Sequence, residues 1–71
     1  MSDDRAEFSV VEFLNDGTHR YVRRWLDAEN AVYLAHYCTR RLRDDVERVV
    51  ITDGGDFTVF QWERGKGVTF K

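Results

Sequence analysis

Phe8 to Trp25 reads FSVVEFLNDGTHRYVRRW, and this stretch decides the fold. Two runs rich in β-branched and aromatic residues flank a short polar segment, Asn15-Asp16-Gly17-Thr18. An Asp-Gly pair between two such runs predicts a β-hairpin. We expect a type I turn with Gly17 in the left-handed conformation.

The turn fixes which residues of the two strands face each other. With Gly17 in that position, Glu12 lies opposite Arg20 and Val10 opposite Val22, a charge pair and an apolar pair. A two-residue loop would instead pair Glu12 with a tyrosine, which is less favourable. We therefore predict the three-residue loop.

The chain after this hairpin has the signals of a helix. Asp27 is a suitable N-cap and Glu29 falls in the first turn, where the helix dipole favours an acid. Apolar residues then recur at three- and four-residue spacing, which predicts one buried stripe: Ala28, Ala31, Ala35, Cys38 and Leu42. We expect the helix to end near Arg43, before two aspartates.

Two further strands are predicted around Asp53-Gly54-Gly55-Asp56, namely Val46 to Thr52 and Phe57 to Trp62. The two glycines are expected to supply the positive φ that a tight loop requires. The expected opposite pairs are Val49 with Phe60, Ile51 with Thr58, Val50 with Val59 and Thr52 with Phe57.

These elements predict an α+β domain of order ββαββ, with a four-stranded, mainly antiparallel sheet and one helix packed on one face. Residues 1–71 are expected to form a single domain, of which residues 1–7 are flexible. The tail from Val68 to Phe70 is available as an additional edge strand.

Both faces of the predicted sheet are apolar, although the sequence supplies one helix to cover them. A helix of about 16 residues is about 24 Å long and about 10 Å wide, enough to cover one face of four strands. We place under the helix Val11, Phe13, Val49, Ile51 and Phe60. The uncovered face then consists of Phe8, Val10, Val22, Phe57 and Val59. The reverse assignment stays open, and it makes Tyr21 and Trp25 interface residues.

An uncovered apolar face indicates self-association, another bound molecule, or a sheet shielded by its own twist and tail. Small domains bury a modest fraction of their surface on folding, and association is a common remedy. We therefore expect a homodimer through the uncovered face, with the chain acting as an interaction or accessory module.

The outer face of the helix is a second candidate surface. It presents Tyr33, His36, Tyr37 and Arg40 away from the apolar stripe. Tyrosine and arginine are enriched at binding hot spots, so this face is a candidate for an unidentified protein partner. The competing interpretation is a tyrosine pair that only stabilises the helix.

Nucleic-acid binding is the alternative function. Arg20, Arg23 and Arg24 interleave with Tyr21 and Trp25 on the second strand, a mixture typical of single-stranded nucleic-acid platforms. Successive side chains of a strand, however, point to opposite faces of the sheet. This places Arg23 on the same face as the two aromatic residues and the other two arginines on the opposite face. The net charge of −2 also disfavours attraction to phosphates.

Neither a metal site, a cofactor site nor an active site is predicted. His36 and Cys38 are two residues apart on a helix and so face different directions, and His19 stands alone. A nucleophile needs a base within hydrogen-bond reach, and no spacing proposes one. Enzymatic activity is therefore not favoured; a site between subunits, lined by His19 or His36, is the remaining way to obtain it.

The single cysteine, Cys38, cannot pair within the chain, which fits a reducing, cytoplasmic setting. The first seven residues lack the order of a signal peptide, and no apolar run approaches the length of a membrane span. We expect no membrane association.

Several stretches together resemble a group of small, uncharacterised alphaproteobacterial proteins. They are residues 10–13 (VVEF), 16–18 (DGT), 21–24 (YVRR), 27–29 (DAE), 48–56 (RVVITDGGD) and 65–70 (GKGVTF). The similarity spans nearly the whole chain and implies a free-standing bacterial domain. It implies no activity, and no role for any residue.

Overall fold

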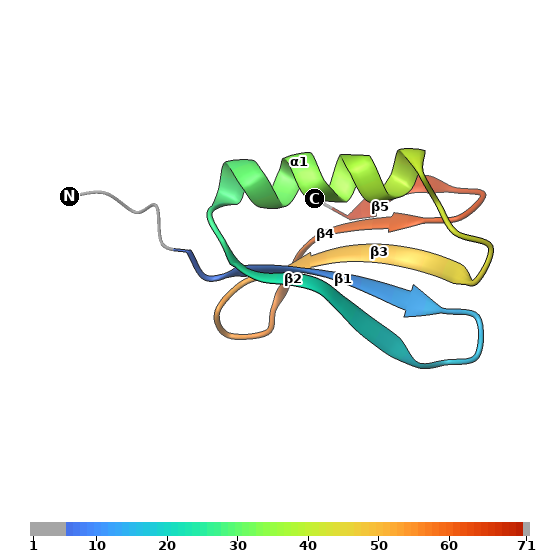
Figure 1. Cartoon of the computed structure of the whole chain (residues 1–71), viewed down its shortest axis with the longest axis horizontal. Coiled ribbons are helices and arrows are strands. Elements are labelled where there is room, and N and C mark those ends of the chain that lie inside the picture. Colours follow the sequence, from blue (N-terminus) through green and yellow to red (C-terminus); the bar gives the residue numbers. More distant parts are fainter. Residues whose placement is uncertain (1–5, 71) are drawn as a thin grey trace.

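The computed structural model describes residues 6–70, which form five strands and one helix (Figure 1). The elements are β1 (Phe8–Leu14), β2 (His19–Leu26), α1 (Ala28–Arg40), β3 (Val46–Thr52), β4 (Thr58–Glu63) and β5 (Gly67–Phe70). All strand pairs are antiparallel, in the sheet order β2-β1-β3-β4-β5. The α+β class and the ββαββ order are confirmed, while the predicted four strands are five because the tail pairs with β4. The segment expected to be flexible, residues 1–7, lies mostly outside the described residues.

The first hairpin has the predicted turn. The Leu14 amide donates to the Thr18 carbonyl over 2.8 Å, and Gly17 has a φ of +91°. Glu12 lies opposite Arg20, as predicted. Val10, however, lies opposite Arg23 and not Val22, because the register shifts between Val10 and its neighbour.

The second hairpin has a loop one residue longer than predicted, and a register shift between Ile51 and Thr52 adds a second residue, so the pairing of β3 with β4 moves by two residues. Ile51 lies opposite Phe60 and not Thr58. The Asp53 side chain accepts hydrogen bonds from the amides of Gly55 and Phe57, over 2.9 and 3.0 Å. Asp56 takes the left-handed conformation, with a φ of 65°, so the expected role of the two glycines was wrong.

Helix α1 begins where the sequence predicted. The Asp27 side chain accepts a hydrogen bond from the Asn30 amide over 2.8 Å, which caps the first turn. The helix ends at Arg40, one turn earlier than expected, and Arg41 is its C-cap. Ala31, Ala35 and Cys38 form its buried stripe.

The helix lies on one side of the sheet and packs mainly against β1 and β3 (Figure 1). The core beneath it contains Val10, Ala31, Ala35, Cys38, Val46, Val49 and Ile51, with Phe8, Phe60 and Trp62 packed around it. Our primary assignment of faces was therefore right for β3 and β4 and wrong for the first hairpin. Phe8 and Val10 lie under the helix, whereas Val11 and Phe13 lie on the face away from it, which we call the open face.

Candidate functional site

The open face consists of two rows of side chains that run across four strands. In one row, register places Tyr21 beside Val11, then Val50, then Gln61. In the next, it places His19 beside Phe13, then Arg48, then Glu63. Val11 and Val50, at the centre, are buried even though no helix covers them. The larger side chains around these valines therefore form the accessible surface.

Those larger side chains stack on one another in a continuous series, which we call the aromatic–arginine row: Arg48, Phe13, His19, Tyr21, Arg24 and Trp25. The Arg48 guanidinium carbon lies 4.4 Å from the centre of the Phe13 ring. That of Arg24 lies 4.7 Å from the Tyr21 ring and 5.2 Å from the Trp25 ring. Cations at such distances over aromatic faces are attracted by the ring quadrupole.

Trp25 has an unusual backbone for a bulky residue. Its φ is 62°, in the left-handed region, where β2 carries an extra residue relative to β1. Its side chain is 68% exposed, and that of Tyr21 is 43% exposed. A backbone conformation of this kind costs of order 1–3 kcal/mol and is typical of binding and functional sites.

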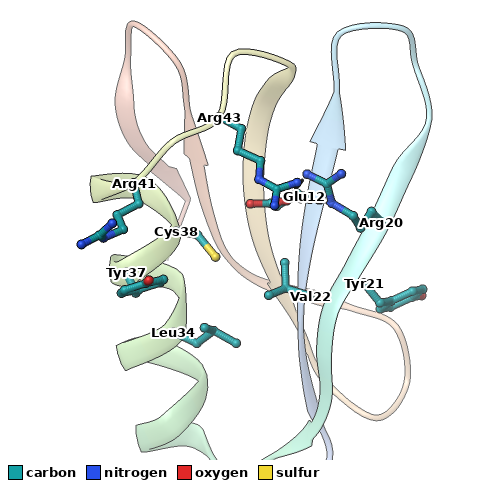
Figure 2. Close-up of a pocket in the computed structure, with 9 residues that line it drawn as sticks. All are labelled: Glu12, Arg20, Tyr21, Val22, Leu34, Tyr37, Cys38, Arg41 and Arg43. Carbon is teal, nitrogen blue, oxygen red and sulfur yellow. Dashed lines mark hydrogen bonds and ion pairs between the residues drawn. The ribbon is translucent and has the colours of Figure 1, made fainter.

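A second candidate is a pocket of about 330 Å³ between α1 and β2 (Figure 2). Glu12 is only 7% exposed and accepts two hydrogen bonds from Arg20 on one carboxylate oxygen, over 2.6 and 3.0 Å. Donating these hydrogen bonds to the Glu12 carboxylate raises the pKa of the Arg20 guanidinium. Burial raises the pKa of the neighbouring Cys38 thiol to about 11, so the thiol stays protonated near neutral pH.

The structure does not gather the five residues of the expected self-association face on one open surface. Val10 is fully buried under the helix. Phe8 and Val59 line an apolar pocket beside the first turns of α1, and Val22 lines the pocket between α1 and β2. Only Phe57, in the β3–β4 loop, projects freely, with 71% of its side chain exposed.

The four residues of the helix candidate fall into two groups. Tyr33, Tyr37 and Arg40 line one shallow depression on the outside of α1. His36 lies apart from them, with its ring 6.2 Å from that of Phe60.

The three arginines of the nucleic-acid alternative are also separated. Arg20 is bonded to Glu12 on the helix side of the sheet. Arg24 belongs to the aromatic–arginine row, contrary to simple alternation, because β2 is irregular. Arg23 is exposed opposite Val10.

Sequence reasoning missed Arg48 and the role of His19 as a stacking partner. The predicted turn already placed His19 opposite Phe13, so that contact could have been read from the sequence. Arg48 could be found only once β1 had been placed beside β3, because the order of the strands cannot be read from the sequence.

Within residues 6–70, no three histidine, cysteine or acidic side chains are grouped so as to hold a metal ion. In the same part of the chain, no helix is long and apolar enough to cross a membrane.

No family model, curated protein or solved structure matches this chain.

Proposed function

We propose that this protein is an interaction module that forms a homodimer through the open face of its sheet. The main support is the aromatic–arginine row, a set of solvent-accessible tyrosine, tryptophan and arginine side chains on a face that no helix or strand of residues 6–70 covers. Those residue types dominate the binding energy of protein interfaces. For the first hairpin the contact surface of the proposal is therefore the reverse of our primary sequence assignment, with Tyr21 and Trp25 in the interface.

The order of residues along the two rows favours a second copy as the partner. A two-fold axis parallel to the strands, between β1 and β3, reverses each row in the facing copy. Phe13 of one copy then lies over Arg48 of the other, and His19 over Glu63. The same operation places Tyr21 over Gln61. Each of the two register rows, Tyr21-Val11-Val50-Gln61 and His19-Phe13-Arg48-Glu63, is thus complementary to itself, in aromatic–cation contact and in polarity.

Two stacked sheets also need a dry centre. Val11 and Val50 lie side by side in register and exchange places under this operation. Aligned sheets pack about 10 Å apart, with their strands rotated by about 30°. Val11 and Val50 are already buried in the single chain, so the larger side chains around them would form the contact between the two sheets.

Single-stranded nucleic acid is the competing occupant, because Arg24 lies over two aromatic rings, as in stacking platforms. Two observations weigh against it. The chain has a net charge of −2, and Glu63 lies opposite Arg48 on the same face. Arg20 does not add charge to this face, because it is paired with Glu12 on the helix side of the sheet. A phosphate backbone would meet little uncompensated positive charge there.

The test is the molar mass in solution, measured by light scattering across a wide concentration range. We expect twice the chain mass for the wild-type protein and the chain mass for Tyr21→Glu, since that variant buries a charge in the proposed interface. Tyr33→Glu is the matched control: it introduces the same charge at an exposed tyrosine on the outside of α1, and it should leave the dimer intact.

Three outcomes would contradict the proposal. A wild-type monomer at every concentration removes the homodimer, and loss of the dimer only in Tyr33→Glu moves the interface to the helix. Binding of a fluorescein-labelled oligothymidine at low salt, weakened by Tyr21→Glu, would assign the open face to nucleic acid instead.

A further inference from the structure

The pocket between α1 and β2 lies on the helix side of the sheet and shares one lining residue, Tyr21, with the open face. It exists because α1 packs mainly on β1 and β3, so that β2 diverges from the helix (Figure 2). Its volume, about 330 Å³, lies at the lower end of the range for small-molecule sites. The pocket is thus large enough for a small organic molecule.

One part of the pocket is apolar. Leu34 and Cys38 point from α1 toward Val22 of β2, as Figure 2 shows. The pKa of the Cys38 thiol is raised by burial, so this side chain is an uncharged part of the wall. This region suits a short hydrocarbon or aryl group.

The other part of the pocket is cationic. Arg20, Arg41 and Arg43 line it together with Glu12, and the exposed Asp45 lies 4.0 Å from Arg20. Three positive charges thus outnumber two negative ones, in a chain whose net charge is −2.

The Glu12 carboxylate, which lines the pocket, does not strongly repel an added anion. Both hydrogen bonds that Glu12 receives from Arg20 neutralise its charge locally. Among residues 6–70, the Arg43 guanidinium forms no ion pair, and it extends into the pocket toward Glu12 and Arg20 (Figure 2). Arg41 points away from Leu34 and Cys38, and its guanidinium carbon lies 5.6 Å from the centre of the Tyr37 ring. Arg43 is therefore the group that is placed to receive an added anion.

We infer that this pocket binds a small amphiphilic anion, a carboxylate or phosphate ester that carries a short apolar group. The apolar group lies against Val22, Leu34 and Cys38, and the anionic group lies against Arg43. Buried apolar contact supplies affinity, and the arginines supply the preference for a negative head group.

The experiment is a titration of the ¹⁵N-labelled protein with four compounds of the same chain length, followed by the amide shifts of Val22, Leu34, Cys38 and Arg43. The compounds are octanoate, octyl phosphate, 1-octanol and octylamine. Octanoate and octyl phosphate should shift these amides at the lowest concentrations, and the tighter of the two identifies the head group. Equal binding of 1-octanol, or tighter binding of octylamine, would overturn the inference.

The variant Arg43→Gln should weaken octanoate binding about tenfold, because it removes one charge-assisted hydrogen bond. Its backbone carbonyl, which accepts a 2.7 Å hydrogen bond from Arg64, is retained, so the fold should not change. Lys66→Gln is the matched control, since it removes the same charge in the turn before β5. Equal weakening in both variants would show that only net charge matters, and would remove the site.

The inference is separable from the proposed dimer. Tyr21 lines the pocket as well as the open face, so the variant that separates the two proposals is Trp25→Glu. It places the same charge in the aromatic–arginine row at an exposed residue that does not line the pocket. Octanoate binding by a monomeric Trp25→Glu protein would support the pocket while the dimer is absent.

Discussion

Cys38 shows at the scale of one residue how the fold controls reactivity. The thiol lies on the buried side of α1, facing the sheet, and its pKa is raised to about 11 by that burial, with the Glu12 carboxylate as a further cause. Since the thiolate is the nucleophile, the folded protein should react very slowly with iodoacetamide at pH 8. Mass spectrometry should show rapid alkylation once urea unfolds the chain, and alkylation at similar rates in both states would contradict the assigned burial.

The same thiol makes stability depend on alkaline pH. An unperturbed cysteine loses its proton near pH 8.5, so between about pH 9 and 11 the folded state holds more protons than the unfolded state. The contribution of the protonated Cys38 thiol to stability is complete below this pH window and is lost as pH rises through it. The free energy of unfolding should fall across the window, and Cys38→Ala should flatten that part of the profile.

At the scale of elements, the Glu12–Arg20 pair joins β1 to β2 on the side facing the helix. The Glu12 side chain is mostly buried and that of Arg20 is partly exposed, so the pair contributes more than a surface ion pair. Glu12→Gln should lower the free energy of unfolding by about 1–3 kcal/mol, because a hydrogen bond to a charged group is lost. The measurement is urea denaturation.

Lys66→Gln is the control for this pair. Lys66 and Glu63 form an exposed ion pair at 3.9 Å, and its loss should change stability by less than about 1 kcal/mol. Equal effects of the two substitutions would show that the Glu12–Arg20 pair is no more stabilising than an exposed one.

Local signals predicted several elements well. The segment Asn15 to Thr18 identified the first turn, and Asp27 identified the start of α1. In both places a side chain or a glycine satisfies a backbone requirement within a few residues. Such requirements are encoded locally and can be read without knowledge of the tertiary structure.

The errors arose where two elements interact. Counting apolar side chains could not tell which face of β1 lies under the helix, because both faces are apolar and Glu12 on the helix side is neutralised by Arg20. Asp56 took the left-handed position that we gave to the glycines, which lengthened the second loop. The irregular register of β2 brought Arg24 onto the side of Tyr21.

At the scale of the whole molecule, the proposed dimer predicts that stability depends on concentration. Folding coupled to association should gain about 1.4 kcal/mol for each tenfold rise in protein concentration. With a urea dependence of about 1–3 kcal/mol per molar, the unfolding midpoint should rise by about 0.5–1.4 M for each tenfold step. Tyr21→Glu should remove that dependence and Tyr33→Glu should keep it. A wild-type midpoint that stays constant over a hundredfold range of concentration would mean that the aromatic–arginine row is not an interface between two copies, and that its exposed tryptophan faces solvent or a different partner.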